Sequence, residues 1–206
     1  MYTLDEPYET RDYKGYTIKI MLEDHVDEMD NPRADEPIGT MTCFHRNYRL
    51  GDEHGYSQND FKGWNDERKL GFAGLLRRLR IDLDIIEVRP LYLYDHSGIT
   101  ISHHPFSCPW DSGQVGWHFI TKQNYRKVFG GKRVSKKARA KVKTILDYEI
   151  ENYDSYLCGE IYWVQVTGPY DWEDTCHGFL GANFERSGIL DFAKHTVEAH
   201  IKELMK

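Results

Sequence analysis

Hydrophobic and polar residues follow two different periods along this chain of 206 residues. Alternation with a period of two, in runs rich in β-branched and aromatic residues, predicts strands. A glycine-containing turn at 96–98 joins two of these runs into a hairpin. We expect two further hairpins, one from the first two runs and one from the last two. The predicted strands are residues 15–21, 39–44, 85–94, 99–102, 114–120, 159–166 and 174–180.

A period of 3.6 residues appears in longer segments and predicts helices. Asn65 and Ser135 are N-cap candidates that mark where two of them begin. Because the strands come in hairpins and do not alternate regularly with helices, the sequence predicts the α+β class. We expect a single domain over residues 1–206, with mostly antiparallel hairpins packed against about three helices. The helices are expected at residues 65–80, 135–157 and 187–205, with a short helix or turn at 121–133.

An acidic segment and a basic segment interrupt this pattern. Residues 23–37 are acidic, contain two prolines and predict an exposed loop, and their spacing does not match a calcium-binding loop. Residues 122–143 carry ten lysines and arginines and no acid, in a chain with a formal net charge of −6. Such a basic segment in an acidic protein is more informative about partners than the net charge.

The basic segment overlaps the start of the helix that we expect from Ser135. Cations in the first turns of a helix are disfavoured by the helix dipole, and a pattern that costs stability is typical of a functional site. Backbone N–H groups at the same helix end would favour a phosphate-bearing partner. The alternative interpretation is a cationic face that pairs with acidic segments of the same fold. The candidate nucleic-acid or anion-binding residues are Lys122, Arg126, Lys127, Lys132, Arg133, Lys136, Lys137, Arg139, Lys141 and Lys143, with Tyr125 and Phe129 placed to stack on bases.

The stretch DHSGITISHHPFSCPWDSGQVGW, residues 95–117, contains the residue types of a hydrolase site. Cys108 precedes a proline and could cap a short turn as a nucleophile, with His96 as base and Asp111 as the residue that orients it. His103, His104 and His118 are alternative bases, and Asp95 is an alternative to Asp111. The structural alternative is a crossing loop fixed by Pro105 and Pro109 and anchored by Trp110 and Trp117.

Metal and cofactor motifs are missing from the sequence. The four cysteines form no C-x-x-C pair, no H-x-x-x-H motif occurs, and there is no glycine-rich phosphate loop. We therefore predict neither a metal site nor a cofactor. The scattered cysteines, the acidic N-terminus and the absence of a long apolar run predict a soluble protein in a reducing cytoplasm.

Four segments of the chain resemble a family of uncharacterised proteins that recurs in bacteriophages and mobile elements. These segments are YLYDHSGI at 92–99, FSCPWDSGQVGW at 106–117, GTMTCFHRNYRLGDEH at 39–54 and DTCHGFLGANFERSG at 174–188, and the likeness extends from about residue 15 to 205. The last segment departs from the family, which would have Trp-Gly-Phe-Tyr-Gly where this chain has His177-Gly178-Phe179-Leu180-Gly181. The resemblance implies a small accessory protein, made during infection or carried on a mobile element, in the cytoplasm of the host cell.

The sequence favours a protein without enzymatic activity. We expect a phage-type accessory protein, for example in anti-defence, that binds nucleic acid or a host nucleoprotein complex through its charged surfaces. Two alternatives remain: a cysteine-dependent hydrolase centred on Cys108, and a structural or assembly protein.

Overall fold

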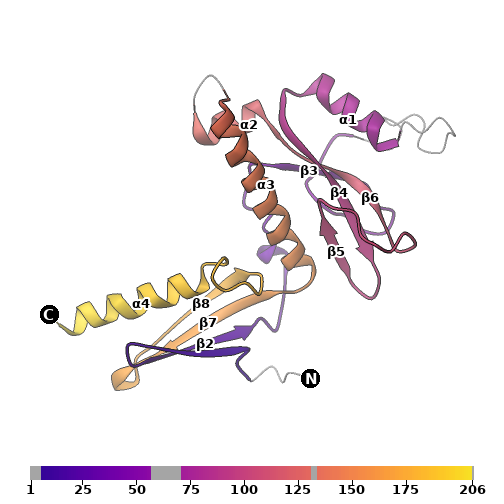
Figure 1. Cartoon of the computed structure of the whole chain (residues 1–206). Coiled ribbons are helices and arrows are strands. Elements are labelled where there is room, and N and C mark those ends of the chain that lie inside the picture. Colours follow the sequence, from indigo (N-terminus) through magenta and orange to yellow (C-terminus); the bar gives the residue numbers. More distant parts are fainter. Residues whose placement is uncertain (1–5, 57–70, 131–133, 206) are drawn as a thin grey trace. The chain divides into compact units, whose positions relative to one another are not determined.

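The computed structural model describes residues 6–56, 71–130 and 134–205. These ranges hold the helices α1 to α4 and the strands β1 to β8, which form two four-stranded antiparallel sheets, so the predicted α+β class is confirmed. The chain groups into two compact units, unit 1 with residues 1–31 and 155–206 and unit 2 with residues 32–154. This grouping does not decide whether residues 1–206 form one domain, so the expected single domain stays a prediction. Each unit contains one sheet (Figure 1).

Unit 1 is a sheet covered on one face by a helix. The strands β1 (Glu9–Tyr13), β2 (Tyr16–Leu22), β7 (Ile161–Thr167) and β8 (Glu173–Leu180) lie in the order β1-β2-β7-β8. The helix α4 (Ile189–Leu204) packs on this sheet with its apolar face. The predicted hairpin of 159–166 with 174–180 is confirmed, and a short 3-10 turn (Pro169–Asp171) connects its strands. The buried core includes Ile18, Ile20, Val164, Val166, Leu190, Ala193 and Val197.

The predicted hairpin of residues 15–21 with 39–44 is wrong. β2 pairs with β1 and β7, whereas the later strand belongs to the sheet of unit 2. β1 is joined to β2 by Lys14 and Gly15, both with positive φ, as tight hairpin turns require. The sequence ETRDY of β1 lacks the apolar alternation that identifies a strand, because none of its residues is fully buried.

Unit 2 contains the second sheet and the remaining helices. Its strands β3 (Thr40–Cys43), β4 (Ile85–Asp95), β5 (Ile99–Ser102) and β6 (Ser112–Thr121) lie in the order β3-β6-β4-β5. All four were expected from the hydrophobic pattern. Pro90 of β4 pairs with Trp117 of β6. Because β5 pairs with β4 only from Tyr92 on, the sheet tolerates the missing N–H of Pro90.

Three helices accompany this sheet: α1 (Gly71–Asp82), α2 (Lys122–Phe129) and α3 (Lys136–Leu157), whose last three residues fall in unit 1. The expected cap Asn65 lies outside the described residues. Ser135 accepts a hydrogen bond from the Ala138 amide (3.1 Å), so the predicted start of α3 is confirmed, as is its predicted end at Leu157. In the described ranges no helix combines the length and hydrophobicity needed to cross a bilayer.

Alternating residues of β6 face two different helices. Phe119 packs with Leu75 and Leu79 of α1, whereas Ile120 packs with Val142 and Leu146 of α3. Because side chains alternate along a strand, His118 shares the α3 side of the sheet with Ile120. The sheet of unit 2 therefore has an apolar contact with α1 on one face, and on the other face it contacts α3 through both apolar and polar side chains.

Candidate functional site

The basic segment forms an exposed surface on α2 and the start of α3. The two helices contact each other, since the ammonium group of Lys141 lies 4.1 Å from the centre of the Phe129 ring. Neither the first turn of α2 nor that of α3 contains an acid. We define the basic surface as the exposed residues Arg126, Lys127, Lys136, Lys137, Arg139, Lys141 and Lys143. Two further candidates, Lys132 and Arg133, lie outside the described residues.

Some cations of this segment are engaged inside the fold. Lys122 is only partly exposed and pairs with Asp84 (2.7 Å), and Lys127 pairs with Glu36 of the acidic loop (2.8 Å). Arg139 donates to the carbonyl oxygen of Ile86 (2.8 Å). The alternative interpretation, in which these cations pair with acids of the same fold, therefore applies to Lys122 and Lys127. Within the ranges that the structure describes, Lys136, Lys137 and Lys143 form no ion pair.

Tyr125 and Phe129 are partly buried, and each ring contacts other side chains of the fold. Tyr125 packs against the core formed by Ile120, Val142 and their neighbours, and its ring lies 5.1 Å from that of Phe129. Lys141 covers Phe129. The basic surface therefore offers chiefly cations, which are contacts for phosphate groups.

The structure brings the hydrolase candidates together in a different order from that of a catalytic triad. Nδ1 of His96 lies 3.3 Å from Oδ2 of Asp111, and the thiol of Cys108 donates to the same oxygen (3.5 Å). In a cysteine hydrolase the imidazole lies between thiol and carboxylate and removes the thiol proton. Here the carboxylate lies between them, and among the described residues the thiol contacts no imidazole. This order favours a structural role for the three side chains.

The alternative bases separate into two places. His104 is exposed, whereas His103 and His118 are buried and contact each other. Asp95 lies beside Asp111 at the end of β4, where its amide donates to the Asp111 carbonyl oxygen (2.8 Å). Asp95, Asp111 and the exposed Trp110 line a cavity of about 450 Å³. Trp110 is 91% exposed, so the prediction that it anchors the crossing loop on the core is wrong, whereas Trp117 does pack there and donates to the Phe72 carbonyl oxygen (2.8 Å).

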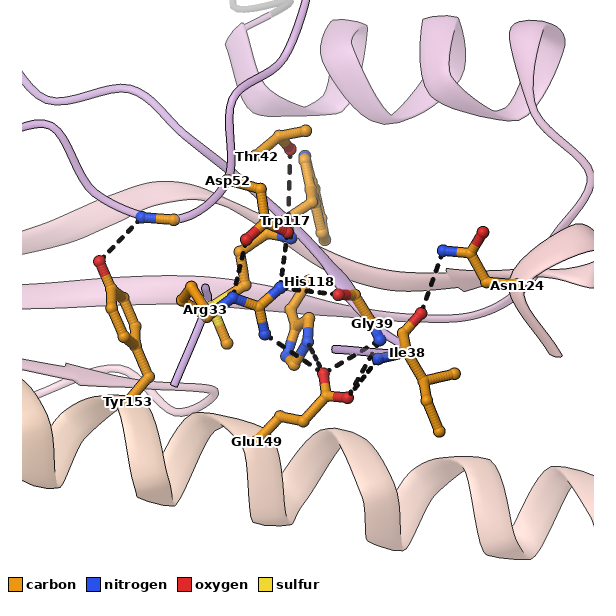
Figure 2. Close-up of polar contacts among 12 residues, drawn as sticks. Arg33, Ile38, Gly39, Thr42, Asp52, Trp117, His118, Asn124, Glu149 and Tyr153 are labelled. Carbon is orange, nitrogen blue, oxygen red and sulfur yellow. Dashed lines mark hydrogen bonds and ion pairs between the residues drawn. The ribbon is translucent and has the colours of Figure 1, made fainter. Parts of the chain in front are cut away.

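A buried polar network connects α3 with the sheet of unit 2, and the sequence did not reveal it (Figure 2). Glu149 accepts hydrogen bonds from the amides of Ile38 (2.9 Å) and Gly39 (3.1 Å). Arg33 binds Asp52 through two nitrogens (2.8 and 2.5 Å) and lies 3.4 Å from Glu149. The side chain of Arg33 is 3% exposed, so the prediction of an exposed loop at 23–37 is wrong at this residue. The reason is that three acceptors hold its guanidinium group, the third being the Gly39 carbonyl oxygen (2.7 Å).

Gly39 makes this close packing possible. A Cβ atom there would lie 2.4 Å from Nε2 of His118 and 2.5 Å from a carboxylate oxygen of Glu149. Any side chain at this position would displace both groups. The glycine of the segment GTMTCF therefore has a packing role beside the network.

Two histidines extend the network towards the surface. Nε2 of His118 lies 3.0 Å from Glu149, and Nδ1 of His118 lies 3.1 Å from Nε2 of His103. Nδ1 of His103 in turn lies 3.4 Å from Asp147, whose side chain is 55% exposed. The chain of contacts thus runs from a buried carboxylate through two imidazoles to a carboxylate at the surface.

Burial controls the protonation of this chain. Burial lowers the pKa of His118. Burial and the charges of His118 and Arg89 lower the pKa of His103 to about 4, although Asp147 has the opposite effect. Burial alone would raise the pKa of Glu149, but the bonds from His118 and Gly39 and the charge of Arg33 outweigh it, so this pKa lies below its ordinary value. Both imidazoles are therefore neutral at pH 7, and Glu149 is ionised.

The hydrogen bonds then assign the tautomers of both rings. Ionised Glu149 accepts from Nε2–H of His118, which leaves Nδ1 of that ring as an acceptor for Nε2–H of His103. Nδ1 of His103 is consequently unprotonated and faces Asp147. The sequence feature that points to this network is Glu149, a charged residue on the largely apolar inner face of α3. Among the described residues, no group of three or more His, Cys, Asp or Glu side chains is placed to hold a metal ion.

The structure and the sequence together define an α+β protein with a cationic helical surface and a polar helix–sheet interface. No model of a protein family, no curated protein and no solved structure matches the chain. The family resemblance of its segments therefore stays a prediction.

Proposed function

We propose that this chain is a phage-type accessory protein that binds the phosphate backbone of nucleic acid through the basic surface. The observation that carries the proposal is the run of five exposed cations in the first eight residues of α3, namely Lys136, Lys137, Arg139, Lys141 and Lys143. Nucleic acid within a host nucleoprotein complex would be bound by the same contacts.

The position of these cations supports a binding role over a purely structural one. The N-terminal end of a helix carries a partial positive charge, so lysines there lower the stability of the helix. Lys136, Arg139 and Lys143 follow one another at helical spacing along one side of α3, and Lys137 and Lys141 do so along another. Two stripes of like charge repel each other in the free protein, and a polyanion removes that repulsion.

The same surface favours backbone contacts over the reading of bases. Phe129 and Tyr125 are engaged with Lys141 and the core, so stacking of bases on them is not supported. Contacts limited to phosphates predict binding with little dependence on nucleotide sequence and a steep dependence on salt.

Fluorescence anisotropy of a labelled DNA duplex tests the proposal. The double variant K136E/K137E should abolish binding near physiological salt. At lower salt, the slope of log K against log salt should become less negative by roughly 2, because each lost phosphate contact contributes about 0.9 to it.

A matched variant controls for net charge. Arg77 on α1 and Lys202 on α4 are exposed and lie outside the basic surface, so R77E/K202E changes the net charge by the same amount. We expect this variant to retain most of the affinity, with the salt slope of the unchanged protein. Binding that survives K136E/K137E, or that both double variants weaken equally, would overturn the proposal.

A further inference from the structure

The cavity beside Asp95 and Asp111 has a composition that the basic surface does not explain. It measures about 450 Å³, which lies in the range of small-ligand pockets. Its lining includes the buried apolar residues Leu93 and Val115 and the almost fully exposed indole of Trp110. A ligand there would meet an apolar floor, an aromatic wall and two carboxylates.

Asp95 and Asp111 lie opposite each other in the backbone register of two neighbouring strands. Tyr94 of β4 pairs with Ser112 of β6, and the bond from the Asp95 amide to the Asp111 carbonyl oxygen (2.8 Å) continues this register by one residue. Like charges directly opposite each other on an antiparallel pair are destabilising. A local arrangement that lowers stability is one mark of a functional site.

Among the described residues, the hydrogen-bond partners of these carboxylates are not lysine or arginine side chains. Asp95 accepts from the hydroxyl group of Tyr48 (3.1 Å), and Asp111 accepts from the thiol of Cys108 (3.5 Å) and contacts His96 (3.3 Å). Several other acids of the described ranges differ in this respect, since Asp84, Glu36 and Asp52 each pair with a lysine or arginine. Within the described ranges, neither carboxylate at the cavity is paired with a lysine or an arginine.

We propose that this cavity binds the guanidinium group of an arginine presented by a partner protein. A guanidinium group is planar, donates in a fork that matches a carboxylate, and stacks on an indole face. Asp95 or Asp111 accepts its N–H groups, Trp110 covers one face of its plane, and Leu93 and Val115 contact the aliphatic part of the side chain. An ammonium group gains the charge attraction but lacks the fork and the flat face, so lysine binds less tightly.

Arg46 lines the same cavity and distinguishes this ligand from an anionic one. Its positive charge opposes a bound guanidinium group and would favour a nucleotide phosphate. The variant R46A should therefore tighten the binding of an arginine peptide. If the natural occupant is a nucleotide, R46A should instead weaken the binding of the nucleotide.

A pair of labelled peptides tests the proposal with the full chain. The first is a short Gly/Ser peptide that carries arginines, the second has lysines at the same positions, and a guanosine monophosphate titration covers the nucleotide alternative. By fluorescence anisotropy near physiological salt, the arginine peptide should bind about tenfold tighter than its lysine counterpart. W110A and D95N/D111N should each weaken it about tenfold or more.

Controls separate this site from general charge attraction and from the basic surface. Asp24 and Asp35 are exposed in the acidic loop, so D24N/D35N removes the same charge and should leave peptide binding unchanged. K136E/K137E should also leave it unchanged, so that failure of nucleic-acid binding and failure of arginine binding are told apart. Three results would overturn the proposal: equal affinity for both peptides, equal losses of peptide binding in D24N/D35N and D95N/D111N, or tighter binding of the nucleotide than of the arginine peptide. Circular dichroism confirms that each variant is folded.

Discussion

Each unit packs a helix against a four-stranded sheet, but the two helix–sheet contacts are built from different interactions. In unit 1, α4 contacts the sheet through apolar residues such as Leu190, Ala193 and Val197. Its polar contacts, from Tyr16 to His200 and from Tyr13 to Glu198, are only partly buried. In unit 2, α3 contributes Val142 and Leu146 but also the carboxylate of Glu149, whose side chain is 12% exposed compared with 42% for Glu198 of α4.

This difference determines how each helix is positioned. Burial of apolar area is not directional, so the position of α4 depends on how its apolar side chains pack against the sheet. Hydrogen bonds and ion pairs depend on direction, and Glu149 satisfies groups from three places in the sequence, namely Arg33, the amides at 38–39 and His118. The network therefore sets the position of α3 along the sheet and, with it, where the basic surface lies in unit 2.

Removal of Arg33 should have the largest effect on stability. The variant R33M leaves Asp52 and Glu149 without their buried cation, and the loss of one partner from a buried ion pair costs about 3–5 kcal/mol. Urea denaturation measures the free energy of unfolding. The control is K14M in unit 1, which removes the exposed pair of Lys14 with Glu198 (2.8 Å) and should cause no loss that denaturation resolves. Equal losses in the two variants would contradict a special role for the buried network.

The local pattern of the sequence predicted most of the elements and little of this network. The strands of unit 2, the cap at Ser135 and the end of α3 follow from alternation, helical period and capping, which depend on neighbouring residues. Arg33 and Glu149 are separated by 116 positions, and their contact depends on which strands pair. Strand pairing was also where the prediction failed, because β1 is too polar to be identified and its absence made residues 39–44 look like the partner of β2.

The candidate sites show the same division. The basic segment could be recognised because its charges are adjacent in the sequence. The pairing of Asp95 with Asp111 depends on the register of β4 and β6, and the tautomers of His103 and His118 depend on Glu149. Composition alone therefore placed Cys108, His96 and Asp111 in one site, but it could not give the order of their contacts.

Acid should weaken unit 2 through its two buried histidines. Their pKa values in the folded protein lie below the ordinary 6.5, so the unfolded chain binds protons first as the pH falls. The contribution to stability is complete above about pH 6.5 and is lost as the pH falls through the lowered pKa values, which for His103 means about 4. The lowered pKa of Glu149 extends the loss below the ordinary pKa of a glutamate. We expect a decrease on the order of 1–3 kcal/mol, partly offset because protonated His103 can donate to Asp147.

Urea denaturation at a series of pH values measures this decrease. Glutamine keeps a hydrogen-bonding side chain but does not titrate, so H103Q/H118Q should flatten the dependence of stability on pH between 6.5 and 4. His195 is exposed on α4 of unit 1, and H195Q should leave the dependence unchanged. A pH profile that is the same in both variants would show that the acid sensitivity arises elsewhere.

The smallest expected effect compares the first turns of α3 and α4. Asp191 stands in the first turn of α4 and Lys202 in its last, which is the favourable orientation, whereas the first turn of α3 has lysines and no acid. K136E/K137E should therefore stabilise the protein by roughly 0.3–1 kcal/mol per residue, and D191K should destabilise it by a similar amount. Thermal or urea denaturation at low salt resolves these differences. If the charges of α3 serve a partner, K136E/K137E should gain stability and lose nucleic-acid binding. If these lysines contribute to folding instead, the same variant should lose stability.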